Sequence, residues 1–326
     1  VIEIYARPAR TVGMAPEYHV SPDVTKIVNI INKARSIKPG GRPAAAGLWI
    51  DRPVDVNNFT LYGDIQSPQL ARVTVLNQPE IFAKVMKQKL QNAGLKIKNA
   101  RVANIDDPGN NDTKTIGHTI ATPISTIVTR CNTDSENLYA ESLIKKIGNE
   151  VTGQPGSWDN GSAIVRMLLS KKLGPALATE AIIIDGSGLS RSNKLTTNLL
   201  TSWMFMMYNE DDLKNIYLDS LAQAGKTGTL KRRFKNYDGN SRILAKSGYI
   251  RQVSCLSGYV IAPTGKAVAF SIMCNEIPPS GSGTVTISQI KKMQEKIVLK
   301  IDEYLLQLNS LAETSDFIIP ANQLGG

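Results

Sequence analysis

The sequence predicts an α/β protein in which helices flank an antiparallel sheet and a mostly β region comes first. Two observations support this. Near the C-terminus, consecutive strand-like runs separated by turns lead into one long amphipathic pattern, and Pro263-Thr264-Gly265 marks one of the turns. The middle of the chain carries several helical patterns. The expected strands are 242–250, 253–261 and 266–274, and the expected closing helix is 288–308.

The first hundred residues are predicted to be loop-rich with short strands. Strand-like runs occur at 1–5, 58–65 and 71–76. The segment 23–35 fits a helix or a strand, and 39–43 is rich in glycine and proline. A clear helix follows, which Asn77 can cap and Gly94 ends.

A polar stretch at 106–115 is the best candidate for a domain boundary. We therefore expect one domain over 1–105 and a second over 106–326. A length of 326 residues suits one large domain or two of ordinary size. Helical patterns follow the boundary at 122–130, 137–147, 162–173 and 196–208.

Composition excludes several classes of protein. With 42% hydrophobic and 20% charged residues, the chain is neither disordered nor a small disulfide-stapled fold. No apolar run approaches the ~20 residues of a membrane span. The net charge of +10 favours an anionic partner, such as nucleic acid, a membrane surface or an acidic wall polymer. Two histidines and three scattered cysteines argue against a histidine-rich metal site, a catalytic triad and a zinc site.

Two short motifs carry the functional signal. Ser135-Glu136-Asn137 is an S-x-N at the start of a predicted helix, and Lys246-Ser247-Gly248 is a K-[ST]-G triplet on a predicted strand. This pair is typical of serine acyl transferases that act on β-lactams or D-alanyl peptides. The lysine and hydroxyl of the triplet suit a carboxylate, and the N–H after its glycine can donate to an oxyanion. The S-x-N side chains can relay a proton and orient a substrate amide.

A second triplet, Lys226-Thr227-Gly228, matches the letters better but lies in a predicted turn. A carboxylate-binding triplet needs a rigid strand, so we assign that role to Lys246 rather than to Lys226. A phosphate loop at 225–227 is disfavoured, because Ser220 stands where that motif needs a glycine.

With these motifs, the chain resembles the D-alanyl-D-alanine carboxypeptidase/endopeptidase family of class C low-molecular-mass penicillin-binding proteins, peptidase family S13. The segments SENLYAESL, IIIDGSGLSRSNKLT, AGKTGTLKRRF and AKSGYIRQVSCLSGYV follow one another in that family's order. The resemblance implies a transpeptidase-like fold of the serine β-lactamase and penicillin-binding type. Residues 1–105 would be a remnant of inserted domains, and 106–326 the C-terminal part of the catalytic domain.

The resemblance also implies a serine-type D-Ala-D-Ala carboxypeptidase or endopeptidase that acts on peptidoglycan peptide stems and binds β-lactams, without a metal or cofactor, in the periplasm or cell envelope. Lys246 and Ser247 would hold the substrate carboxylate, and Gly248 would allow close approach. The site would be completed by the Tyr249 N–H in the oxyanion hole, by Ser135 as proton relay and by Asn137 as substrate-positioning residue.

The family's nucleophile is a serine in an S-x-x-K motif that precedes the inserted domains, and nothing matches it in that order here. The pair Ser142 and Lys145 lies on the helix of Asn137, and the pair Ser288 and Lys291 lies on the closing helix, so both are interpreted as helix-surface pairs. The chain begins at Val1, with neither a methionine nor a signal peptide. We therefore expect that it starts inside the insertion, lacks the nucleophile, and exposes an edge of its sheet.

Other interpretations stay open from sequence alone. The same elements could form a non-catalytic wall-binding or β-lactam-binding remnant. Ser135 and Asn137 could only cap a helix, and Ser187 could approach the site, although a tight turn explains it. The basic run 231–235 could bind nucleic acid, but a solvated basic loop is the simpler explanation, and we expect no nucleic-acid partner.

Overall fold

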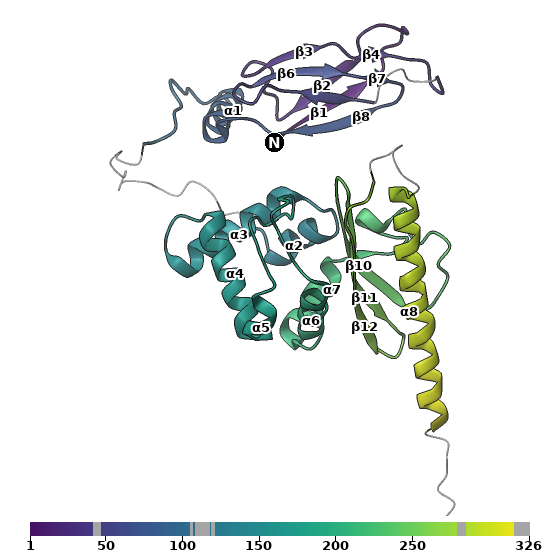
Figure 1. The fold of residues 1–326 in the computed structure, drawn as a ribbon. Helices are drawn as coiled ribbons and strands as arrows, with labels where there is room; N and C mark the ends of the chain where they lie inside the picture. Colours follow the sequence, from purple (N-terminus) through teal and green to yellow (C-terminus); the bar gives the residue numbers. More distant parts are fainter. Residues whose placement is uncertain (42–46, 105–106, 108–117, 119–120, 279–284, 316–326) are drawn as a thin grey trace, which may run out of the picture. The chain divides into compact units, whose positions relative to one another are not determined.

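The computed structural model describes residues 1–41, 47–104, 107, 118, 121–278 and 285–315. The chain divides into two compact units, Val1–Ile116 and Gly117–Gly326 (Figure 1). The boundary predicted between 105 and 106, and most of the polar stretch 106–115, lie outside the described residues. Within the described part, no helix is long and apolar enough to cross a membrane.

The first unit is built from short strands and one helix. β1 (Ile2–Arg7) pairs antiparallel with β2 (Glu17–Ser21) and β8 (Gln69–Val73). β6 (Asn58–Tyr62) pairs parallel with β3 (Asn29–Asn32) and antiparallel with β5 (Trp49–Asp51), and β4 (Arg35–Ser36) pairs with β7 (Asp64–Ile65). Alternate strand residues point inward, so Ile2, Ile4, Phe59 and Leu61 share one buried core.

Helix α1 (Gln78–Asn92) forms where the sequence pattern predicts it, and Asn77 is its N-cap residue, although not through its side chain. Asn77 has a left-handed backbone with φ of 51°, and it makes no side-chain capping bond. Its Nδ2 instead donates to Glu80 Oε2 at 2.6 Å. The ambiguous segment 23–35 is a turn followed by β3, so the strand interpretation holds for its second half.

The second unit begins with helices. They are α2 (Ile124–Asn132), α3 (Asn137–Thr152), α4 (Trp158–Leu173), α5 (Pro175–Ala178), α6 (Thr197–Tyr208) and α7 (Asp211–Ser220). Helix α4 starts four residues before its predicted start, because Ser157 and Asn160 form a capping box. Helices α3 and α4 pack so closely that a Cβ at Gly161 would lie 2.2 Å from the Ile144 carbonyl oxygen.

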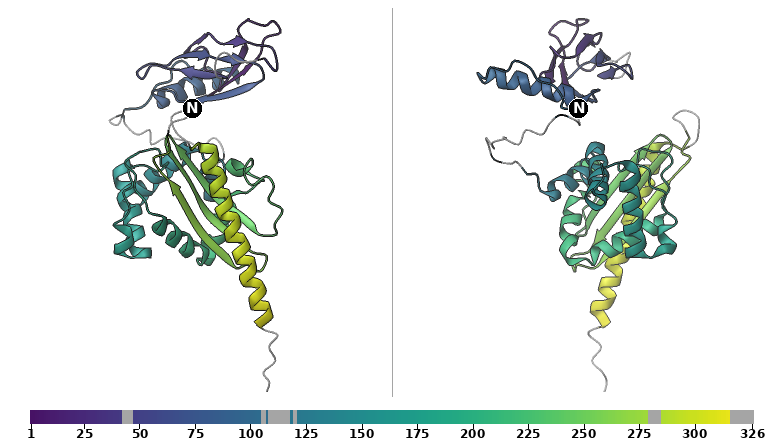
Figure 2. Two further views of the ribbon diagram at one scale, coloured as in Figure 1. Left: turned by 45° about the vertical axis from the view of Figure 1, so that its right-hand side comes forward. Right: turned by 90° about the vertical axis from the view of Figure 1, so that its left-hand side faces the viewer.

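One antiparallel sheet with the order β12-β11-β10-β9 follows these helices. The strands β10 (Arg242–Ile250), β11 (Val253–Ile261) and β12 (Ala267–Cys274) match the three predicted ones, whereas the short β9 (Ala222–Gln223) was not predicted. Helix α8 (Ile287–Ser315) covers one face of the sheet, and α6 packs on the other (Figures 1 and 2). The predicted antiparallel sheet between helices is therefore confirmed.

Both edges of this sheet have stretches without a strand partner among the described residues. β9 pairs with β10 only at Leu244 and Ala245, so β10 continues from Lys246 to Ile250 with a partner on one side only. β12 pairs with β11 alone. An unpaired edge of this kind can accept another extended chain.

Candidate active site

The turn between α2 and α3 holds the S-x-N motif. Thr133 Oγ1 donates to the Ser220 carbonyl at 2.6 Å, which fixes this turn to the end of α7. Ser135 has a left-handed φ of 58°, which is uncommon for residues other than glycine and clusters at functional sites. Glu136 is the N-cap residue and Asn137 the first helical residue of α3, so the capping interpretation of Ser135 and Asn137 is wrong.

Lys246 of β10 joins the two motifs. Its Nζ donates to Ser135 Oγ and to the Ser247 carbonyl, each at 2.7 Å. Burial lowers the pKa of Lys246 below its ordinary value of 10.5, and the nearby Cys131 thiol only partly opposes this. The S-x-N turn and the K-S-G strand, 111 residues apart between Ser135 and Lys246, thus meet through one hydrogen bond.

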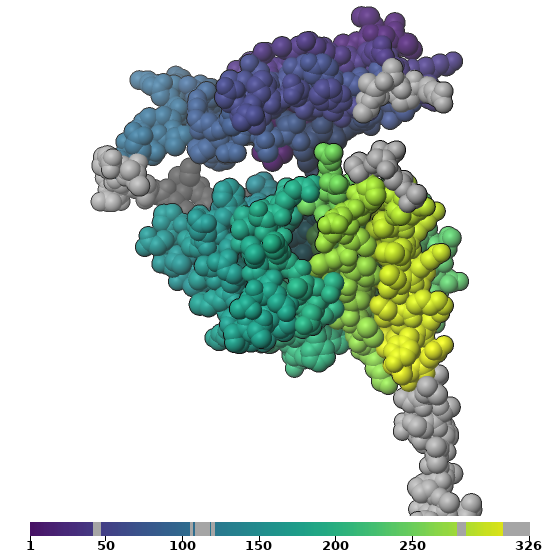
Figure 3. All heavy atoms as spheres, in the orientation of Figure 1, coloured from purple at the N-terminus to yellow at the C-terminus, as the bar shows by residue number. Residues whose placement is uncertain are grey.

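A cavity of about 490 Å³ opens where the motifs meet. All six predicted site residues line it: Ser135, Asn137, Lys246, Ser247, Gly248 and Tyr249. Figure 3 shows a hollow between the teal helices and the green strands of this unit. Gly248 leaves space over its strand, because a Cβ there would meet nothing closer than Cys255 Cβ at 3.6 Å.

Several lining residues were not predicted from sequence. Cys255 lies opposite Gly248, and Ser257 lies opposite Lys246, in the pairing of β10 with β11. Pairing the two predicted strands and following alternate residues from Lys246 could have identified both. Ser187 also lines the cavity. From sequence, its approach to the site was one of two interpretations, the other being a tight turn. Apolar side chains also line the cavity: Leu189, Leu195, Leu200, Trp203, Met204, Tyr217, Leu221, Ile250 and Met273.

Glu141 of α3 anchors the loop that carries Ser187. Its carboxylate accepts hydrogen bonds from Trp158 Nε1 at 2.6 Å and from the Gly186 and Ser187 amides at 3.2 and 3.1 Å. Burial acts to raise the pKa of Glu141, but the hydrogen bonds from Ser187, Trp158 and Gly186 outweigh it and hold the pKa below its ordinary value of 4.5. This wall of the cavity is therefore fixed by charge-assisted bonds.

The second K-[ST]-G triplet plays a different part in the structure. Lys226 is exposed in the turn after β9, and Thr227 Oγ1 closes that turn by accepting from the Gln223 amide at 2.8 Å. A short 3₁₀ helix, η1 (Gly228–Leu230), follows. The preference for Lys246 agrees with this geometry, because Lys246 lines the cavity and Lys226 does not.

The basic run 231–235 is only partly the solvated loop that we predicted. Arg233 is 8% exposed, and its Nε donates to Glu295 Oε1 of α8 at 2.8 Å. The same guanidinium donates to the Lys291 carbonyl at 2.9 Å. The prediction is wrong for Arg233 because a partner on a distant helix compensates its buried charge.

The two S-x-x-K pairs of the chain have other contacts. Ser142 Oγ donates to the Leu138 carbonyl within α3 at 2.8 Å, and Lys145 Nζ lies 3.8 Å from the Trp158 ring centroid. Lys291 Nζ lies 5.6 Å from the Tyr249 ring centroid. In the described part of the chain, four serines line the cavity, Ser135, Ser187, Ser247 and Ser257, and none is followed by a lysine three residues later.

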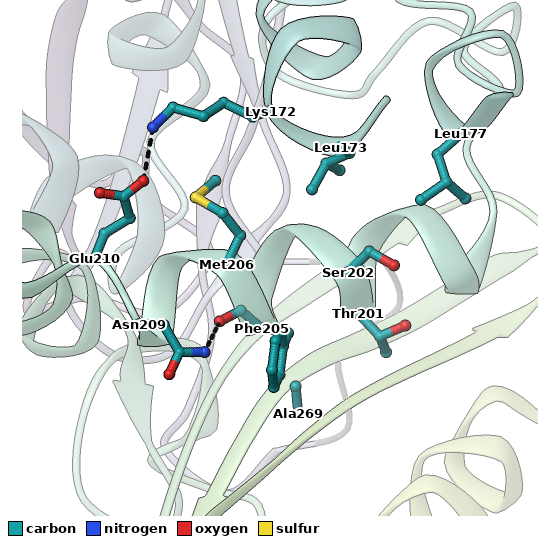
Figure 4. Close-up of a pocket in the computed structure, with 10 residues that line it drawn as sticks. All are labelled: Lys172, Leu173, Leu177, Thr201, Ser202, Phe205, Met206, Asn209, Glu210 and Ala269. Carbon is teal, nitrogen blue, oxygen red and sulfur yellow. Dashed lines mark hydrogen bonds and ion pairs between the residues drawn. The ribbon is translucent and has the colours of Figure 1, made fainter. Parts of the chain in front are cut away.

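A larger pocket of about 780 Å³ lies beside β12, between α4, α5 and α6 (Figure 4). Its lining is half apolar and half polar or charged, and Phe205 within it is 70% exposed. Lys172 Nζ and Glu210 Oε1 form an ion pair at 2.6 Å on its rim. None of the six predicted site residues belongs to this pocket. Across the described residues, no group of three or more His, Cys, Asp or Glu side chains could hold a metal ion.

Two curated proteins named as carboxypeptidases are similar to this chain. The chain is 29% identical over 274 residues to a D-alanyl-D-alanine carboxypeptidase of an Actinomadura species. These residues cover 81% of this chain and 48% of that protein. It is 27% identical over 248 residues to the penicillin-sensitive carboxypeptidase A of Dictyostelium discoideum, over 73% of this chain and 45% of that protein. The chain thus spans about half the length of these relatives.

Solved structures share the fold. Penicillin binding protein 4 from Haemophilus influenzae matches with a TM-score of 0.68 at 18% identity, over 92% of this chain and 65% of that chain. The same protein complexed with a β-lactam matches with a TM-score of 0.64, over 92% of this chain and 68% of that chain. The predicted penicillin-binding fold is confirmed. The family model described as the D-Ala-D-Ala carboxypeptidase 3 (S13) family matches residues 8–296, and the chain therefore belongs to that family.

Proposed function

We propose that the chain forms the substrate-binding side of a serine-type D-Ala-D-Ala carboxypeptidase that cleaves peptidoglycan peptides through an acyl-enzyme. The observation that carries this proposal is the 2.7 Å hydrogen bond between Lys246 Nζ and Ser135 Oγ, which joins the S-x-N and K-S-G motifs at one cavity. Carboxypeptidase activity in the names of two relatives supports it.

The cation and hydroxyl of the triplet bind the substrate's terminal carboxylate in this proposal. Lys246 supplies the positive charge and Ser247 a hydroxyl donor. Ser135, held by the Lys246 ammonium, passes a proton to the amine of the leaving D-alanine.

The open stretch of β10 receives the substrate backbone. Gly248 lets it lie close, because no side chain stands over the strand at that point. The Tyr249 N–H donates to the developing oxyanion, and Asn137 orients the substrate amide.

The nucleophile is proposed to lie outside this chain, in a segment with an S-x-x-K serine. The lysine of that motif deprotonates the serine, whose oxygen bonds to the scissile carbonyl carbon as D-alanine leaves, and water then hydrolyses the ester. The β12 edge and the exposed Phe205 in the pocket beside it are surfaces that such a segment would cover.

A fluorescent penicillin tests the proposal. We expect no covalent labelling of this chain, labelling of a longer form that includes the S-x-x-K segment, and loss of that labelling in the longer form with Lys246→Met. Labelling of the present chain would overturn the assignment of the nucleophile to another segment.

A non-catalytic wall-binding or β-lactam-binding protein is the second candidate. It is favoured by the absence of an S-x-x-K serine among the serines that line the cavity. Reversible penicillin binding, with no labelling of the longer form, would select it. Either function places the protein in the periplasm or cell envelope, which fractionation of the source cells would test.

A further inference from the structure

Thr229 connects the predicted carboxylate-binding hydroxyl to the rest of the site. Ser247 Oγ and Thr229 Oγ1 are hydrogen-bonded at 2.8 Å, with Ser247 as donor in the structure. We propose that Thr229 is a positioning residue that turns the Ser247 hydroxyl toward the ligand's carboxylate. The inference rests on the proposed role of Ser247 in carboxylate binding.

The backbone around Thr229 is fixed to the S-x-N turn. The Thr229 amide donates to the Thr133 carbonyl at 3.1 Å. Gly228 has a φ of 50°, and a Cβ there would lie only 2.0 Å from the Thr133 carbonyl oxygen. Thr229 thus contacts the turn that precedes Ser135 through its backbone and the K-S-G strand through its side chain.

The following residues hold the same segment from the other side. Leu230 is fully buried in the core between the sheet and α8. Arg233, through its bonds to Glu295 and the Lys291 carbonyl, ties the segment to α8. A hydroxyl on such an anchored segment is held in place before a ligand arrives, which reduces the ordering cost of binding.

The direction of the Ser247–Thr229 bond decides whether Ser247 can bind an anion. Each hydroxyl carries one hydrogen, and a carboxylate only accepts. When Ser247 donates to Thr229, only the lone pairs of Ser247 Oγ face the ligand, and they repel a carboxylate. When Thr229 donates to Ser247, the Ser247 hydrogen is available to the carboxylate, and the chain of two hydroxyls strengthens that bond. Donation from Thr229 to Ser247 is therefore the arrangement that leaves the Ser247 hydrogen for an anionic ligand.

The test compares two ligands on the full chain by isothermal titration. One is an N-acylated peptide ending in D-Ala-D-Ala with a free carboxylate, and the other is its C-terminal carboxamide. We expect Thr229→Val to weaken binding of the carboxylate peptide about 3- to 10-fold and to leave the carboxamide unchanged, and Thr229→Ser to restore the wild-type preference. Thr227→Val, which removes a hydroxyl from the same loop, is the matched control and should keep the preference.

Each outcome separates this inference from the proposed function. If the wild-type chain does not prefer the carboxylate peptide, the proposed site fails and the inference fails with it. If the wild type prefers it and Thr229→Val keeps the same preference, only the role of Thr229 is overturned. Equal weakening of both peptides would show a merely structural role, and thermal unfolding of each variant checks that it is folded.

Discussion

The surroundings of Lys246 shift its pKa, and we therefore expect ligand binding at this site to depend on pH. Burial lowers its pKa below 10.5, so it loses its positive charge at a lower pH than an exposed lysine. We predict that affinity for a carboxylate peptide falls as pH rises through this lowered pKa, by up to about tenfold per pH unit. Titrations between pH 7 and pH 10.5 measure it.

Lys246→Met provides the control for this pH dependence. The variant should bind the carboxylate peptide weakly at every pH and show no loss over the same window. Constant wild-type affinity up to pH 10.5 would contradict the role of the ammonium. Stability changes in the opposite direction to affinity as the pH rises. The unfolded chain binds the Lys246 proton more tightly than the folded one, so the free energy of unfolding increases with pH between the pKa of Lys246 in the folded chain and 10.5.

The candidate site residues could be proposed from sequence because each belongs to a short motif or directly follows one, whereas the residues that contact and support them could not. Thr229 lies just before the basic run 231–235 and Arg233 within it, and neither has a local pattern that identifies its partner. Arg233 is buried against α8, where Glu295, 62 residues later, and the Lys291 carbonyl accept its hydrogen bonds. A contact of that range depends on how helix and sheet pack, which the periodicity of either element does not encode.

At the level of elements, β10 and β11 each carry a glycine, and only the one on β11 is so tightly packed that a side chain would not fit. A Cβ at Gly258 of β11 would lie 2.1 Å from the Leu244 carbonyl oxygen and 2.5 Å from Ala245 Cα, so the backbone would have to move. We predict that Gly258→Ala lowers the free energy of unfolding by about 1–3 kcal/mol. Urea unfolding of the second unit, followed by tryptophan fluorescence, measures this change.

Gly248→Ala is the matched variant on the facing strand. The nearest atom to its new methyl group would be Cys255 Cβ at 3.6 Å, an ordinary contact, so stability should change by less than about 0.5 kcal/mol. The methyl group would project into the cavity, and peptide binding should weaken. Equal destabilisation by both variants would contradict this account of the two strands.

Elements with a long, regular pattern were predicted well, and short ones were not. The three long strands of the second unit and the helices around them carry their own periodicity. β9 has two residues and β5 has three, which is too short for alternation to be visible. Asn77 shows a different limit: its residue type suits a cap, but its left-handed backbone turns the side chain toward Glu80.

For the whole molecule, the family and the penicillin-binding fold could be predicted because motifs in all parts of the second unit follow one order. The division into domains stays a prediction at its boundary. One edge of the sheet in the second unit lacks a partner: β12 has the sequence of an interior strand, with buried Phe270 and no charged residue, yet among the described residues it pairs with β11 alone. Isolated edge strands usually carry charges that prevent further pairing.

This open edge leads to a prediction about the complete protein. If a segment outside this chain pairs with β12, the β12 amides that point away from β11 should exchange rapidly with solvent deuterium here and become protected in a longer form. The β11 amides, which have a strand on each side, should be protected in both forms and serve as the internal control. Hydrogen exchange followed by mass spectrometry of peptides from 253–274 measures both sets. Full protection of β12 in the present chain would show that its edge is already covered, and would remove the structural argument for a missing strand.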